Sequence, residues 1–154
     1  MDLIEELKKL ISQLERNEID YALCGGLAIA IYAKPRATLD IDIMIDPNFL
    51  EKAKMAVSEL GFELSAAPMN LHDGAIIIHR LVKIDEISGE HLVLDFLLVT
   101  SKTKEAWEDK ITVEWEGNPL KVVSPNGLIL LKSFRKSGQD KDDIEYLRSL
   151  VIED

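Results

Sequence analysis

The sequence predicts an α+β domain, in which a mixed β-sheet is flanked by helices at both ends of the chain. Apolar residues recur at helical spacing near each terminus, whereas the middle of the chain holds short apolar runs separated by turn residues. The 154 residues contain no internal repeat, low-complexity tract or interdomain linker. We therefore expect one domain that spans residues 1–154.

The first helix is expected over residues 3–15, because its leucines and isoleucines fall on one face at spacings of three and four. A short buried strand over residues 21–24 follows and ends on Gly25 and Gly26. The next helix, over residues 27–33, is rich in alanine and ends before Pro35, because proline disfavours helical geometry in the preceding residue.

Asp40 and Asp42 lie in the most informative segment, a strand expected over residues 40–45. Alternate side chains of a strand share a face, so the two carboxylates project side by side while isoleucines at 41, 43 and 45 pack on the other face. Neighbouring carboxylates on a buried sheet are costly unless something positive binds them, and a divalent cation is the natural candidate. The simpler alternative is an exposed strand with ordinary polar alternation.

A helix is expected from Asp46 to Gly61, with Asp46 as its N-cap, Pro47 at the first helical position, and Phe49 and Ala53 facing inward. The remaining elements, in order, are strands over residues 75–81 and 91–100 with a hairpin turn at Ser88-Gly89, a short helix over 102–110, a hairpin of strands 111–115 and 120–123, and C-terminal helices over about 125–151.

Asp95 is a second unusual acid, because it interrupts an apolar run over residues 91–99. A carboxylate inside such a strand loses several kcal/mol of solvation unless it is paired or bound to a metal. One alternative is a buried salt bridge to a lysine or arginine. The other is a purpose shared with Asp40 and Asp42, since three carboxylates supply the oxygen ligands that Mg²⁺ prefers.

The two glycines at 25 and 26 separate a strand from a helix, where bare backbone N–H groups can receive an anion such as a phosphate. The alternative is a turn that needs a positive φ angle at one glycine. The chain contains neither a GxGxxG nor a GxxxxGK[ST] motif, so no Rossmann or P-loop motif is present.

In combination, these motifs resemble the DNA polymerase β-like nucleotidyltransferase superfamily. The pattern is a hydrophobic position, held here by Cys24, then Gly-Gly, a short helix, Asp40-x-Asp42 between hydrophobic residues, and a later acid in an apolar strand. A helical lysine, Lys132, followed by an arginine and an acidic cluster over 140–143 resembles the small bacterial members, including those of toxin–antitoxin and abortive-infection systems. The resemblance covers about residues 19–150 and implies the nucleotidyltransferase fold.

The resemblance implies a metal-dependent enzyme that moves a nucleoside monophosphate from a nucleoside triphosphate to a hydroxyl group and releases pyrophosphate. Asp40 and Asp42 would hold Mg²⁺ against the triphosphate. Asp95 would complete a site for a second Mg²⁺ ion and help to activate the attacking hydroxyl. This assignment agrees with the needs of phosphoryl transfer, which are charge neutralisation and positioning.

Five residues are assigned to the nucleotide by the same resemblance. Gly25 and Gly26 would bind phosphates through their backbone amides, and Lys132 would neutralise phosphate charge. Arg36 and Thr38 precede the acidic strand as in the small bacterial members, although Thr38 has the alternative role of fixing the entry to the strand.

The net charge of −10 argues against nonspecific nucleic-acid binding and disfavours an RNA acceptor. The acceptor is otherwise open between a protein side chain, a tRNA end and a small molecule such as an aminoglycoside, and analogy with the minimal family members suggests a small helical partner protein. The single cysteine, the absence of a signal-like start and the lack of a ~20-residue apolar run lead us to expect a cytoplasmic protein without a membrane span. The alternative function is a non-catalytic, antitoxin-like or degenerate module that binds a partner protein.

Overall fold

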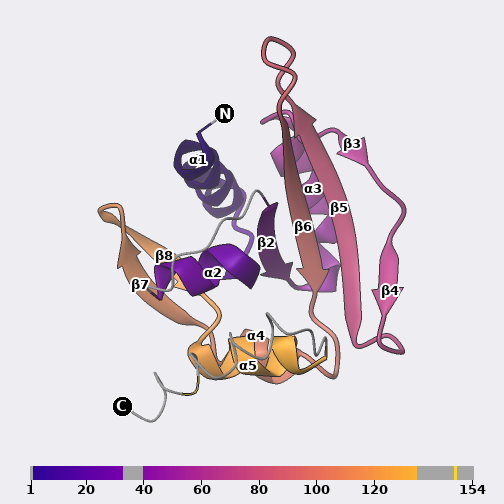
Figure 1. Ribbon diagram of the computed structural model, residues 1–154, viewed down its shortest axis with the longest axis vertical. Helices are drawn as coiled ribbons and strands as arrows, with labels where there is room; N and C mark the ends of the chain where they lie inside the picture. The colour runs from indigo at the N-terminus through magenta and orange to yellow at the C-terminus, as the bar shows by residue number, and fades with distance from the viewer. Residues whose placement is uncertain (1, 33–39, 135–147, 149–154) are drawn as a thin grey trace.

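The computed structural model describes residues 2–32, 40–134 and 148 (Figure 1). Arg36 and Thr38 lie outside the described residues. So does the helix expected over 140–151, apart from Arg148.

A mixed β-sheet forms the centre of the described structure (Figure 1). Its order is β3-β5-β6-β2-β1-β8-β7, and β4 also pairs with β5. The β2–β6 and β1–β8 pairs are parallel and the others are antiparallel, which confirms the expected mixed sheet. The strands are β1 (Ala22–Cys24), β2 (Asp40–Ile45), β3 (Leu64–Ser65), β4 (Met69–Leu71), β5 (Ile76–Ile84), β6 (His91–Leu98), β7 (Ile111–Trp115) and β8 (Asn118–Val122).

Helices cover the sheet and close its lower end in Figure 1. The helix α1 packs against α3, α2 packs against β2, and α4 lies beside α5 at the bottom of the view. Asp2 begins α1 and Ser124 begins α5, and each side chain accepts hydrogen bonds from backbone N–H groups of the first turn, as expected for N-caps. The helices are α1 (Leu3–Arg16), α2 (Gly25–Ile31), α3 (Leu50–Ser58, after a 3₁₀ turn η1 over Pro47–Phe49), α4 (Lys104–Glu108) and α5 (Pro125–Ser133).

The strand β2 runs through the core as its alternation predicts. Ile41, Ile43 and Ile45 are completely buried, together with Leu10 and Leu14 of α1. Burial of each such side chain contributes roughly 1.5–3 kcal/mol, so the apolar face of β2 fixes which face its acids occupy.

Two local expectations are wrong, and two short strands are unforeseen. The helix α2 begins at Gly25 rather than at residue 27, because Gly25 takes a φ of +68° and turns the chain directly from strand into helix. Phe49 is 40% exposed rather than inward, since it lies in the 3₁₀ turn before α3, whereas Ala53 is buried as expected. The strands β3 and β4 were not expected, because they are only two and three residues long and are too short to show a period.

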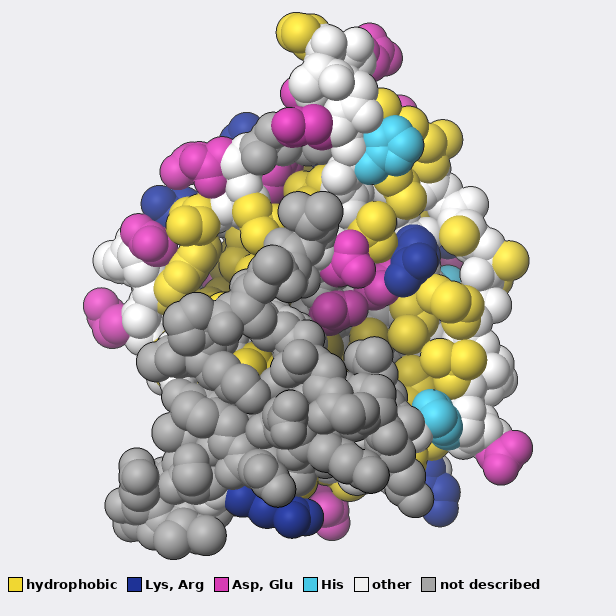
Figure 2. All heavy atoms as spheres, in the orientation of Figure 1, with side chains coloured by type: hydrophobic (Ala, Val, Ile, Leu, Met, Phe, Trp, Pro, Cys, Tyr) yellow, Lys and Arg dark blue, Asp and Glu magenta, His cyan; other side chains and the backbone are white. Residues whose placement is uncertain are grey.

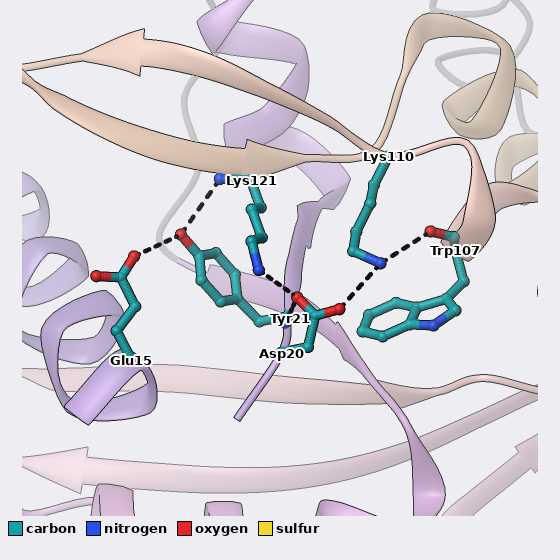
Figure 3. Close-up of polar contacts among 6 residues, drawn as sticks. All are labelled: Glu15, Asp20, Tyr21, Trp107, Lys110 and Lys121. Carbon is teal, nitrogen blue, oxygen red and sulfur yellow. Dashed lines mark hydrogen bonds and ion pairs between the residues drawn. The ribbon is translucent and has the colours of Figure 1, made fainter. Parts of the chain in front are cut away.

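A cluster of lysines and acids joins the start of β1 to the ends of α4 and β8 (Figure 3). Asp20 lies between two ammonium groups, with its carboxylate oxygens 2.6 Å from Lys121 Nζ and 3.2 Å from Lys110 Nζ. The Tyr21 hydroxyl accepts a hydrogen bond from the Lys121 backbone at 3.2 Å. We call this group the lysine cluster; its members are Glu15, Asp20, Tyr21, Trp107, Lys110 and Lys121.

Among the described residues, each helix is too short or too polar to pass through a bilayer.

Candidate functional site

One row of side chains crosses four strands of the sheet. The strand register sets Cys24 opposite Asp42, Asp42 opposite Asp95, and Asp95 opposite Arg80. Residues directly opposite one another on neighbouring strands share a face. All four side chains therefore project from the same side of β1, β2, β6 and β5, and all four line one pocket. We call them the cross-strand row.

The pocket has a volume of about 430 Å³ and two unlike sides. Its charged side holds the three acids predicted from the sequence, together with Arg80 and Lys132. In the space-filling view, acidic side chains gather beside a basic one, and hydrophobic side chains border them (Figure 2). The apolar side is formed by Met69, Leu71, Ile76, Ile78, Leu97, Leu128 and Leu131.

Asp40 and Asp42 are both partly exposed and both line this pocket. The alternation that the sequence predicts in β2 is present, but the polar face opens into a hollow rather than onto a flat exposed surface. The sheet thus presents two carboxylates side by side to whatever enters the pocket.

Asp95 is held by Arg80. The Arg80 Nε and Nη2 atoms each donate a hydrogen bond to a different Asp95 oxygen, both at 2.9 Å. The Asp95 side chain is 6% exposed and that of Arg80 is 39% exposed. Of the two alternatives for Asp95, the structure contains the buried salt bridge.

The Arg80 guanidinium lies in the field of all three acids. The hydrogen bonds to Asp95 raise the pKa of Arg80, burial opposes the rise, and the charges of Asp95, Asp40 and Asp42 add to it. Sequence reasoning missed Arg80. The available signal was a charged residue within the apolar strand expected over residues 75–81.

Gly25 touches the acidic strand. Its φ of +68° is a conformation that favours glycine, as the turn interpretation requires. A Cβ atom built on Gly25 would also lie 2.8 Å from the Asp42 Cγ, a distance that side chains do not tolerate. Glycine is therefore needed at position 25 both for the turn and for the close approach to Asp42. Gly26 follows within α2 and is not among the pocket-lining residues.

Two further polar residues of the pocket are Lys132 and Cys24. Lys132 projects from α5 and is 7% exposed, which is rare for a lysine. Burial raises the pKa of the Cys24 thiol, the Asp42 and Asp95 charges raise it further, and Lys132 opposes them. Cys24 is therefore a protonated packing residue rather than a nucleophile.

The carboxylates of the pocket suit Mg²⁺ better than a metal ion that needs to be enclosed by protein ligands. Within residues 2–32, 40–134 and 148, no three His, Cys, Asp or Glu side chains are arranged to enclose a metal. Mg²⁺, however, is commonly held by one or two carboxylates, water and substrate phosphates, which is what Asp40 and Asp42 at a pocket wall offer. Arg36 and Thr38, expected near the nucleotide, are outside the described residues.

No protein-family model matches the sequence, and neither does any curated protein. Solved structures do match. The lincosamide antibiotic adenylyltransferase LnuA, with lincomycin bound, is 18% identical over 94% of this chain and 96% of its own, with a TM-score of 0.62. ANT(2")-Ia in complex with adenylyl-2"-tobramycin is 13% identical over 96% and 88%, with a TM-score of 0.63. An antigenic nucleotidyltransferase-like protein from Paracoccidioides brasiliensis is 20% identical over 92% and 72%, with a TM-score of 0.56. The chain therefore has the nucleotidyltransferase fold, as the resemblance implied.

Proposed function

We propose that this nucleotidyltransferase-fold chain is a Mg²⁺-dependent enzyme that transfers a nucleoside monophosphate from a nucleoside triphosphate to a hydroxyl group and releases pyrophosphate. One observation carries the proposal. Asp40 and Asp42 share one face of β2 in a pocket that also contains Gly25 and the buried Lys132.

In the proposed reaction the acceptor oxygen attacks the α-phosphorus, the bond between the α-phosphorus and the bridging oxygen breaks, and pyrophosphate leaves with that electron pair. Asp40 and Asp42 would hold Mg²⁺, and the ion would supply charge neutralisation and orientation for the triphosphate. Lys132 adds positive charge, and the backbone amide of Gly25, which lines the pocket, binds a phosphate oxygen; the role expected for Gly26 has no such support from the pocket lining. Asp95 receives the hydroxyl proton, since each carboxylate oxygen keeps an acceptor position besides the bond from Arg80.

We propose a small molecule as the acceptor, ahead of a protein side chain or an RNA end. The pocket volume of about 430 Å³ lies in the range of small-molecule sites, and one side of its wall is apolar. The net charge of −10 disfavours a polyanion. Two structural neighbours of similar length carry small antibiotics in their structures, lincomycin and adenylylated tobramycin.

The test is isothermal titration of each of the four nucleoside triphosphates with Mg²⁺, on the wild type and on Asp40→Asn/Asp42→Asn. Glu86→Gln is the matched control, because Glu86 is an exposed acid outside the pocket. We expect binding to the wild type and the control, and none to the double variant. Equal binding to all three proteins would refute the proposal.

A second candidate, a nucleotide-binding module without transfer activity, is favoured by the Arg80–Asp95 ion pair, which engages both oxygens of the third acid. Incubation with α-labelled triphosphates and a lysate separates the two functions. A labelled acceptor that disappears with Asp95→Asn supports the enzyme. Triphosphate binding without any labelled product supports the module.

A further inference from the structure

We propose that Arg80 supplies the second positive charge of this site, so that the pocket takes one divalent cation, at Asp40 and Asp42, instead of two. The inference rests on the proposed function, because it concerns the same pocket. It replaces the two-ion site that the resemblance implied with a site of one ion and one fixed guanidinium.

The geometry of the ion pair is the first argument. A second divalent ion would need oxygen atoms from Asp95, which is the only acid of the cross-strand row besides Asp42. Both Asp95 oxygens already accept hydrogen bonds from Arg80 at 2.9 Å, in the two-pronged arrangement that matches a planar guanidinium to a carboxylate, so a second ion on their remaining lone pairs would lie close to the guanidinium charge. A lysine or a hydrated ion at this position would lack that match.

The surroundings of the pair are the second argument. Asp95 is 6% exposed, so loss of Arg80 would leave a poorly solvated carboxylate without its cation. The charges of Asp40 and Asp42 act on the same guanidinium, so one cation already serves the whole group of acids. A second dication beside Asp95 would face the positive charge of Arg80 at close range.

The other end of the row offers no replacement ligand. Asp42 is flanked there by Cys24, whose sulfur is soft and buried, whereas Mg²⁺ selects hard oxygen ligands. Among the described residues, the carboxylates of Asp40 and Asp42 are therefore the ligands left for a divalent ion, together with water and substrate phosphates.

The experiment counts bound Mn²⁺ by electron paramagnetic resonance of the free ion. It uses the full chain with Mn²⁺ alone and with Mn²⁺ plus α,β-methylene-ATP. Five proteins are compared: the wild type, Arg80→Gln, Arg80→Lys, Asp95→Asn and the control Glu86→Gln. After subtraction of the ion carried by free nucleotide, we expect one Mn²⁺ per chain in the wild type, the control and Arg80→Lys, which keeps the charge. We expect two in Arg80→Gln, with the second ion bound within tenfold of the first.

Asp95→Asn keeps the test decisive even if Arg80→Gln fails to fold, because it preserves the shape of the side chain. We expect it to retain one Mn²⁺ with an affinity within threefold of the wild type. Two ions in the wild type, one ion in a folded Arg80→Gln, or loss of the ion in Asp95→Asn would each overturn the inference while leaving metal binding in place. No bound Mn²⁺ in the wild type would instead overturn the proposed function itself.

Discussion

The pocket and the lysine cluster are built from similar charged side chains, but only the lysine cluster has equal numbers of acids and cations. The lysine cluster sets two acids, Glu15 and Asp20, against two lysines, and its ammonium groups are within 3.3 Å of their oxygen partners. The described residues that line the pocket include three acids against Arg80 and Lys132. A cluster with balanced charges fixes the chain, whereas an acidic excess inside a hollow is suited to a cation from outside.

The lysine cluster and the pocket also differ in how they shift the pKa values of their residues. Burial opposes ionisation of Asp20, but hydrogen bonds from Lys121 and Lys110 outweigh burial and lower the pKa of Asp20. In the pocket, the neighbouring acids raise the pKa of Arg80 instead. In the lysine cluster, two cations stabilise the charge of one acid. In the pocket, three acids stabilise the charge of one arginine. Substitutions in the two clusters should therefore separate stability from binding.

The largest effect is expected from Asp42→Asn. We expect binding of the triphosphate with Mg²⁺ to weaken about 100-fold or more, because a bound metal contributes several kcal/mol and each 1.36 kcal/mol is tenfold. The melting temperature should stay equal or rise, since one of three like charges is removed. Calorimetric titration and thermal unfolding measure the two quantities. Unchanged affinity together with a lowered melting temperature would make the pocket another structural cluster.

The next effect is expected from Arg80→Met, which leaves the buried Asp95 without its partner. We expect a loss of about 2 kcal/mol in the free energy of unfolding, less than the 3–5 kcal/mol of a fully buried pair because Arg80 is 39% exposed. Denaturant titration at pH 7 measures it. Arg80→Met/Asp95→Met should recover most of the loss, because both charges are then absent. A single variant as stable as the wild type would contradict the assigned role of the ion pair.

Tyr21→Phe tests the lysine cluster at alkaline pH. Burial raises the pKa of Tyr21 from 10.0 to about 12, the charges of Glu15 and Asp20 add to the rise, and the hydrogen bond from Lys121 opposes it. Because the folded pKa is the higher one, the stabilisation is complete below pH 10 and is lost as the pH rises towards 12. Between pH 8 and pH 11 the wild type should lose about 1 kcal/mol that Tyr21→Phe keeps.

Denaturant titration of both proteins at the two pH values measures this difference. Tyr32, whose pKa burial also raises, contributes equally to both and cancels. A parallel decline of the two proteins would show that Tyr21 does not carry the effect.

The smallest effect is expected from Asp20→Asn. The Asp20 side chain is 47% exposed, so the loss at pH 7 should be under about 1 kcal/mol, as for other exposed ion pairs. The folded pKa lies below 3.8, so the stabilisation is present above pH 4 and disappears as the pH falls through the folded pKa. Stability curves from pH 7 to pH 2.5 measure it. A change in triphosphate affinity would show that the lysine cluster affects binding as well as stability.

Much of the pocket could be predicted from the sequence, because polar and apolar residues alternate in β2 and its apolar face is buried. That alternation alone places Asp40 and Asp42 together, and the anomaly of an acid in an apolar strand points to Asp95. The nucleotidyltransferase fold followed from how these motifs combine with the two glycines.

The pairing of Arg80 with Asp95 could not be predicted from the charged residue alone, because it depends on the register of one hairpin. A turn centred at Ser88-Gly89 would place Val82 opposite Asp95, whereas the pairing in the structure is centred one residue earlier and places Arg80 there. Sequence patterns locate a turn only to within a residue or two, and each residue of error moves the partner by two positions along the strand. The short β3 and β4 have too few residues to show any period, although Met69 and Leu71 of β4 give the pocket part of its apolar wall.

The cross-strand row has a consequence for how this chain reaches its native state. Cys24, Asp42, Asp95 and Arg80 come from four strands that are joined only when every pairing is correct. A slip of β2 by one residue would turn Ile41 and Ile43 into the pocket and drive two carboxylates into the apolar core. The acids thus raise the free energy of misaligned sheets during folding. The residues proposed for chemistry therefore also favour the strand alignment that creates the pocket.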